Sequence, residues 1–155
     1  MVGPLDQVCG GVAALHEGRV EGGRRAARRQ AVILLYQRDV TGLSLEELED
    51  NAAREGAPLD PFARALVEGV ASDTASLDEL ITRAAEGWTA ERLAPLERNI
   101  LRVAVHEILD WPDIPTAVSI NEAVDLAKRY CQAEAPGLVN GILGRIAADA
   151  AGVAR

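Results

Sequence analysis

The chain has 155 residues, of which 48% are apolar and 3% aromatic, and its formal net charge is −8. This length fits one ordinary domain with one core, and no apolar run approaches the roughly 20 residues that span a bilayer, so we expect a soluble protein without membrane contact. Cys9 and Cys131 show no metal-ligand spacing with His16 or His106. We therefore expect reduced thiols in the cytoplasm, with no metal and no cofactor.

The folded domain is predicted to begin near Arg24. Residues 1–23 are rich in glycine and lack helical periodicity, which indicates a mobile N-terminal extension. We expect the domain to cover 24–150 and residues 151–155 to form a short tail. From residue 24 to about 40, apolar side chains recur at helical spacing, and Gly42 then ends the helix.

The next segment contains two helix start signals. Ser44 followed by Glu47 reads as a capping box, which predicts a helix to about residue 55. Asp60-Pro61 offers an N-cap acceptor before a proline suited to the first helical position. Apolar residues keep helical phase beyond it, so we expect one long helix over 60–85, kinked at 69–72.

The sequence of the C-terminal half also predicts helices. Pro95 opens a deeply packed helix that Trp111-Pro112 ends. Ser119 and Glu122 repeat the capping-box spacing, and a last helix is expected from about residue 136. No strand hairpin signal or internal repeat interrupts this pattern, so the predicted class is an all-α bundle.

Although the net charge is negative, one segment contains a local excess of arginine. Residues 19–38 contain six arginines and one glutamate. At about 100 degrees per residue, Arg25, Arg29, Val32 and Tyr36 share one ridge, which we expect to face outward. Guanidinium groups bind phosphates and an aromatic ring can stack on an unpaired base, so the ridge is a candidate site for single-stranded RNA. A solvated arginine face is the alternative, and charge alone does not decide between them.

No residue pattern indicates catalysis. His106 lies within an apolar helical segment, where a structural histidine is the more common case. The glycine pairs at 10–11 and 22–23 lack the preceding strand and the spacing of a phosphate-binding loop. We expect that the chain is not an enzyme.

Four motifs, taken together, resemble the NusB family of bacterial antitermination factors. In chain order they are Leu96-Glu97-Arg98-Asn99-Ile100-Leu101-Arg102, Asp113-Ile114-Pro115, Ile120-Asn121-Glu122-Ala123-Val124-Asp125-Leu126-Ala127-Lys128 and Val139-Asn140-Gly141-Ile142-Leu143. The similarity extends over about residues 24–148. It implies a compact bundle of about seven helices in two helical subdomains. It also implies a transcription factor that binds boxA RNA together with the ribosomal protein NusE and joins the RNA polymerase antitermination complex, promoting read-through in ribosomal RNA operons.

The resemblance also implies roles for individual residues. The RNA-binding residues would be Arg24, Arg25, Arg28, Arg29, Tyr36, Lys128 and Tyr130. The protein-partner residues would be Glu97 and Glu134. Family members usually carry a basic residue and an aromatic directly before Val-Asn-Gly, whereas this chain has Gly137 and Leu138. This departure implies the loss of one phosphate contact.

Two other kinds of protein share this pattern. RNA cytosine methyltransferases carry a NusB-like domain before a catalytic domain, and we expect no such domain here because the sequence ends at Arg155. A helical protein-protein adaptor or homodimer with weak or no RNA binding is the second alternative. Gly137 and the net charge favour the adaptor, whereas the arginine ridge favours RNA binding.

Overall fold

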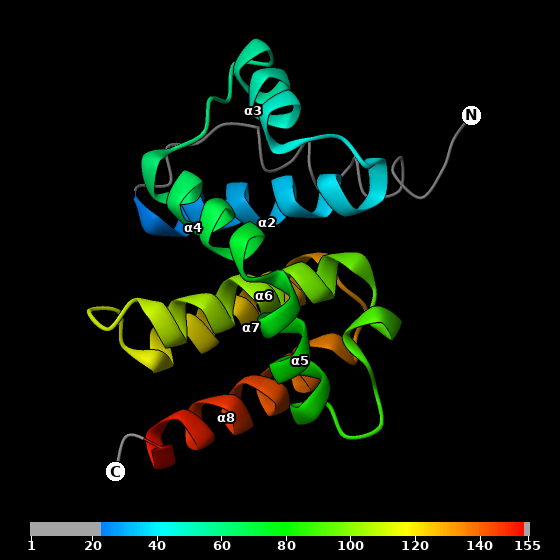
Figure 1. The fold of residues 1–155 in the computed structure, drawn as a ribbon, viewed down its shortest axis with the longest axis vertical. Helices are drawn as coiled ribbons and strands as arrows, with labels where there is room; N and C mark the ends of the chain where they lie inside the picture. Colours follow the sequence, from blue (N-terminus) through cyan, green and yellow to red (C-terminus); the bar gives the residue numbers. More distant parts are fainter. Residues whose placement is uncertain (1–22, 154–155) are drawn as a thin grey trace. The chain divides into compact units, whose positions relative to one another are not determined.

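The computed structural model describes residues 23–153, and these residues form seven α-helices, one short 3-10 helix and no strand. In chain order (Figure 1) they are α2 (Arg24–Thr41), α3 (Leu45–Arg54), α4 (Pro61–Ser72), α5 (Thr74–Ala84), η1 (Ala90–Arg92), α6 (Pro95–Asp110), α7 (Thr116–Tyr130) and α8 (Ala135–Val153). The all-α class is confirmed. The predicted mobile extension, apart from Gly23, lies outside the described residues.

The chain divides into two compact units at Val67 and Glu68. The first unit contains α2, α3 and the first turns of α4, and α3 packs on α2. The capping box at the start of α3 is confirmed, because Ser44 Oγ accepts from Glu47 N at 3.1 Å and Glu47 Oε2 accepts from Ser44 N at 2.9 Å. The two bonds satisfy donors that the helix itself leaves unpaired, so local sequence sets this boundary.

The segment 60–85 forms two helices, so the predicted single long helix is wrong. Asp60 caps α4 as expected, since its Oδ1 accepts from Phe62 N at 2.8 Å. The break comes at Asp73. There Ser72 Oγ donates to Gly69 O at 3.1 Å and Thr74 Oγ1 donates to Val70 O at 2.8 Å. Because these hydroxyls satisfy the last carbonyls of α4, the helix can end without a glycine.

The second unit is built around α6, which contacts α5, α7 and α8. Every residue from Asn99 to Glu107 is buried. The polar members of this run have partners: Arg102 forms a bidentate pair with Asp78, with both N···O distances 2.7 Å, and Glu107 Oε1 accepts from Ser119 Oγ at 3.1 Å. These bonds hold α5 and α7 against the central helix.

The second predicted capping box is wrong. The helix α7 already begins at Thr116, after Pro115, and Ser119 lies within it at 2% exposure. Its hydroxyl bonds to Glu107 of α6 instead of capping its own helix. The Ser119 hydroxyl therefore donates to a carboxylate on another helix. The capping-box spacing had predicted that it would accept from a backbone N–H of its own helix.

The last helix, α8, begins one residue before the expected start and continues to Val153, into the segment expected to be a tail. Within residues 23–153, no helix is long and apolar enough to cross a membrane. The same range contains no group of three His, Cys, Asp or Glu side chains arranged to hold a metal ion.

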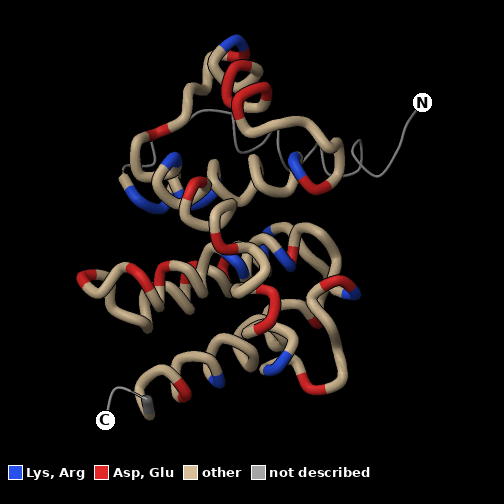
Figure 2. Tube along the Cα trace, in the orientation of Figure 1, with Lys and Arg blue, Asp and Glu red and all other residues tan. Residues whose placement is uncertain are grey.

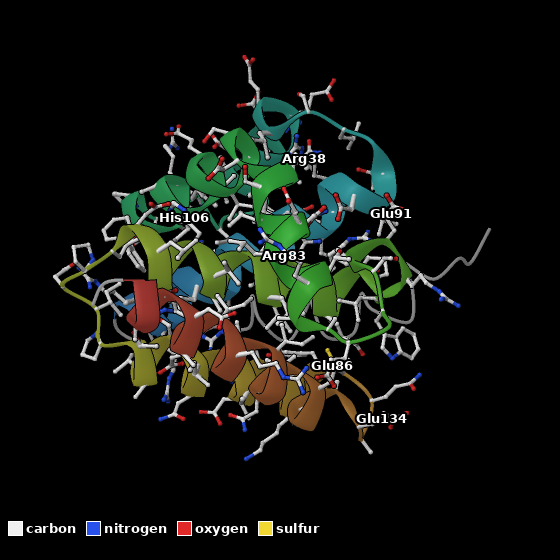
Figure 3. The ribbon with its side chains drawn as sticks, turned by 60° about the horizontal axis from the view of Figure 1, so that its bottom comes forward. Arg38, Arg83, Glu86, Glu91, His106 and Glu134 are labelled. Carbon is white, nitrogen blue, oxygen red and sulfur yellow. The ribbon has the colours of Figure 1, made fainter. Side chains whose placement is uncertain are left out.

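His106, labelled on α6 in Figure 3, has a structural environment. It is 7% exposed, and its Nε2 accepts from Trp111 Nε1 at 3.1 Å. Its Nδ1 lies 3.0 Å from Asp110 Oδ2, outside hydrogen-bond alignment. Gly69 of α4 approaches the same ring so closely that a Cβ at position 69 would overlap Cε1 and Nε2. A side chain at position 69 would thus require the imidazole of His106 to shift.

We predict that Gly69→Ala lowers the free energy of unfolding by about 1–3 kcal/mol, because the new methyl group must displace the buried imidazole. The matched control is Gly144→Ala in α8, where a Cβ meets no atom within 4 Å. That variant should be stabilised by about 0.5–1 kcal/mol, the usual gain over glycine inside a helix. Urea unfolding followed by circular dichroism measures both, and equal effects in the two variants would contradict the proposed overlap.

Candidate nucleic-acid and protein interfaces

Four arginines form the basic start of α2: Arg24, Arg25, Arg28 and Arg29. Figure 2 shows them as a blue stretch where the helix begins. Arg24 and Arg25 are exposed, whereas Arg28 and Arg29 are only 5% and 7% exposed. The first two can therefore meet a ligand directly, whereas the last two are largely covered.

The basic start of α2 lies at the positive end of the dipole of its own helix. Among the described residues, the first turn of α2 contains no acidic side chain, and the N-cap, Gly23, forms no side-chain cap. The exposed N–H groups make this the positive end of the helix dipole, where each added cation costs typically 0.3–1 kcal/mol. An anion such as phosphate would relieve this repulsion and also accept from the N–H groups.

The predicted outward ridge on α2 is wrong. Arg25 is exposed, but Arg29, Val32 and Tyr36 are buried, with Tyr36 only 3% exposed. Residues 32–36 read Val-Ile-Leu-Leu-Tyr, and a helix that is apolar all round is covered all round. Since the ring of Tyr36 is covered, it offers no open surface for base stacking in this structure.

A second basic segment lies at the C-terminal end of α7, in the other unit. Lys128 and Arg129 are exposed and Tyr130 is half-buried. The Cζ atom of Arg129 lies 5.7 Å from the centroid of the Tyr130 ring. Cations at this end of a helix stabilise the helix dipole, so a local role accounts for part of the pattern. The family resemblance predicted that Lys128 and Tyr130 bind RNA, but it did not indicate Arg129, which lies between them.

Phe62, the single phenylalanine of the chain, was not predicted as a site residue. Its ring lies against the guanidinium groups of Arg24 and Arg28. The sequence signal was weak, because Phe62 also fits the apolar phase of its own helix. The contact is between two helices, so periodicity within either one does not indicate it.

The two carboxylates expected to bind a protein partner lie close enough to interact. Glu97 is in the first turn of α6, and Glu134 lies just before α8, at the start of the orange ribbon in Figure 3. Burial raises the pKa of Glu97, a hydrogen bond from the backbone of Ala94 partly opposes this shift, and the charge of Glu134 adds a smaller increase. Burial and the nearby charge of Glu134 thus both oppose ionisation of the Glu97 carboxyl group.

Cys131 adjoins this acidic pair. Burial, followed by the negative charge of Glu97, raises the pKa of its thiol to about 12. The thiol is therefore protonated at neutral pH and is a poor nucleophile. Cys131 forms no disulfide, and Cys9 lies outside the described residues.

The positions that depart from the family pattern lie in the first turn of α8. Gly137 is exposed, and a Cβ built there meets no atom within 4 Å, while Leu138 is half-buried. There is thus room for a basic side chain at position 137, although this chain has none.

Comparison with known proteins gives one consistent result. A sequence model of the NusB family matches residues 25–148. The chain is 43% identical over 133 residues to the transcription antitermination protein NusB of Myxococcus xanthus, covering 81% of this chain and 95% of that protein. The structure is similar to that of T. maritima NusB, with a TM-score of 0.75 and 34% sequence identity. The match covers 83% of this chain and 92% of that chain. It is also similar to a chain in a crystal structure of the antitermination factors NusB and NusE in complex with dsRNA, with a TM-score of 0.73 and 28% sequence identity. This match covers 81% of this chain and 96% of that chain. The chain therefore belongs to the NusB family.

Proposed function

We propose that this protein is a transcription antitermination factor that binds boxA-type single-stranded RNA together with NusE. In this role it would help RNA polymerase read through terminators in ribosomal RNA operons, in the bacterial cytoplasm. It would act by binding alone, without catalysis or a cofactor. The observation that carries the proposal is the basic start of α2, where Arg24 and Arg25 are exposed in the first turn, at the positive end of the helix.

The geometry supports RNA in particular because the two exposed guanidinium groups are adjacent and stand beside N–H donors at the helix end. Phosphates of a nucleic-acid backbone can use both kinds of donor. We assign the direct contacts to Arg24, Arg25 and Lys128, and a supporting role to buried Arg28 and Arg29. Tyr130 is the half-exposed ring that could stack on a base, whereas Tyr36 would need a rearrangement.

The acidic pair supports a basic protein as the second partner. The solved complex contains NusE beside its NusB chain, and ribosomal proteins are rich in lysine and arginine. A cation placed against Glu97 and Glu134 would relieve their mutual repulsion. A helix-end role for Glu97 is the alternative, because an acid in the first turn stabilises the dipole without a partner.

The first test is the double variant Arg24→Ala/Arg25→Ala. We expect RNA affinity to fall about tenfold, and the salt dependence of binding to flatten by roughly 0.7 per lost phosphate contact, because fewer counterions are released. Fluorescence anisotropy with boxA RNA over a salt series measures both quantities. Since the solved complex contains dsRNA, the same titration should include a duplex.

Arg83→Ala is the matched control, because Arg83 is exposed on α5 and pairs with Glu79. It should leave RNA affinity unchanged. If the double variant binds RNA like the wild type while remaining folded, the adaptor or homodimer alternative becomes the better reading.

A gain-of-function variant tests the departure before Val-Asn-Gly. Gly137→Lys places a cation where the family usually has one, and the open space at this position accepts it. We expect tighter RNA binding and a salt dependence steeper by roughly 0.7, since one phosphate contact is restored. Gly152→Lys, near the opposite end of α8, controls for added charge alone. An equal gain in both variants would show that position 137 has no special role.

The acidic pair is tested by Glu97→Lys. We expect NusE binding to weaken at least about tenfold, because a lysine would face a basic partner. RNA binding by the isolated chain should change little. Glu68→Lys, at an exposed position of α4, is the control for a general charge effect. Calorimetric titration measures the affinity, and unchanged NusE binding in a folded Glu97→Lys protein would assign Glu97 to helix stabilisation alone.

The pKa of Glu97 adds a pH dependence with a defined sign. Because its pKa is raised in the folded protein, the ionised carboxylate lowers stability, a cost that appears as pH rises from the ordinary glutamate pKa through the raised value. A cationic partner favours the ionised form and should lower this pKa again. NusE binding should therefore tighten and release protons as pH rises through the same window, and Glu97→Gln should remove most of the dependence.

A further inference from the structure

The ring of Phe62 contacts two arginines of the basic start of α2. The Cζ atom of Arg24 lies 4.8 Å from the ring centroid, and that of Arg28 lies 5.7 Å from it. Both distances fall within the roughly 6 Å over which a guanidinium is attracted to an aromatic face. One half-buried ring thus contacts one exposed and one buried guanidinium.

A chain of hydrogen bonds fixes Phe62 in this place. Its backbone N–H donates to Asp60 Oδ1 at 2.8 Å, which caps α4. Gln30 of α2 binds the segment that leads into this cap, because its Nε2 donates to Pro58 O at 3.0 Å and its Oε1 accepts from Asp60 N at 3.0 Å. The helix that carries the arginines therefore also holds the start of the helix that carries the ring.

A ring positions a guanidinium in a different way from a carboxylate. A carboxylate takes N–H donors and neutralises the charge, as Asp78 does with Arg102 in the other unit. An aromatic face attracts the flat face of the guanidinium, and this contact in itself uses none of the in-plane N–H donors. Phe62 can thus restrict Arg24 without itself occupying the N–H donors that a phosphate would bind.

We propose that Phe62 is a positioning residue of the RNA interface, which holds Arg24 in the orientation that meets an RNA phosphate. The proposal rests on the proposed RNA-binding function of the basic start of α2. Fixing the guanidinium before binding lowers the conformational entropy that must be lost in the complex. Arg28, on the same ring, supplies further positive charge below the surface.

The experiment measures boxA RNA affinity by anisotropy for the full chain and for Phe62→Leu and Phe62→Tyr, each also combined with Arg24→Ala. Leucine keeps apolar bulk but removes the ring, whereas tyrosine keeps the ring. We expect Phe62→Leu to weaken RNA binding about three- to tenfold, the range set by a partly exposed cation–π contact. Phe62→Tyr should remain within about twofold of wild type. In the Arg24→Ala background, Phe62→Leu should change affinity by less than about twofold, because the group that it positions is absent.

The outcomes separate this inference from the function on which it rests. If Arg24→Ala weakens RNA binding while Phe62→Leu does not, the positioning role is wrong and the RNA site stands. If Phe62→Leu lowers RNA affinity equally in the wild-type and Arg24→Ala backgrounds, Phe62 acts only through the fold, and the inference is again overturned. Absence of salt-dependent RNA binding by the wild type overturns the proposed function and the inference with it. Should Phe62→Leu fail to fold, Phe62→Met gives the same comparison, with circular dichroism as the check on folding.

Discussion

The bidentate pair between Arg102 and Asp78 is the constraint on which the second unit depends. Arg102 is 8% exposed, and a buried charge is costly unless it is paired and hydrogen-bonded. Its Nε and Nη2 each donate to Asp78 at 2.7 Å, and its Nη1 donates to Asn99 Oδ1 at 3.1 Å. Asn99 in turn donates to Pro95 O at 2.8 Å, at the beginning of the same helix. The network therefore fixes the first turns of α6, and with them the position of Glu97.

The basic start of α2 and the acidic pair of Glu97 and Glu134 share one electrostatic property, although they have opposite charge. Arg24 and Arg25 stand at the positive end of a helix, and Glu97 interacts with Glu134 where burial already raises its pKa. In each arrangement, a charge lies close to another charge or helix end of the same sign. Local costs of this kind are typical of functional sites, where a ligand of opposite charge removes them. A net charge of −8 does not conflict with RNA binding, because the cations are concentrated at one helix end.

Local signals in the sequence predicted the fold well, and they failed where a tertiary contact replaced a local one. The Ser44 capping box formed because its partners lie three residues apart. Ser119 has the same spacing to an acid, yet its hydroxyl bonds to Glu107 on another helix. The prediction of an outward ridge on α2 was wrong for a related reason, since the apolar side chains of residues 24–40 were expected to cover one face of the helix and leave the opposite face to solvent. The unbroken apolar run at 32–36 already indicated that this face is covered. The acidic pair was predicted only through the family resemblance, because no spacing rule joins positions 97 and 134.

Aromatic residues are few in this chain, and most of them lie outside the core. The chain has five of them, and apart from Tyr36 the buried hydrophobic residues of the described range are alanine, leucine, isoleucine and valine. Phe62 lies near the guanidinium groups of Arg24 and Arg28, Trp88 lies near that of Arg92, and Tyr130 lies near that of Arg129. None of these three rings is fully buried, and Trp88 is 50% exposed. Rings that orient cations at the surface contribute little to core packing. Replacing one by leucine should therefore affect ligand binding more than stability, which is the opposite of what a core aromatic would give.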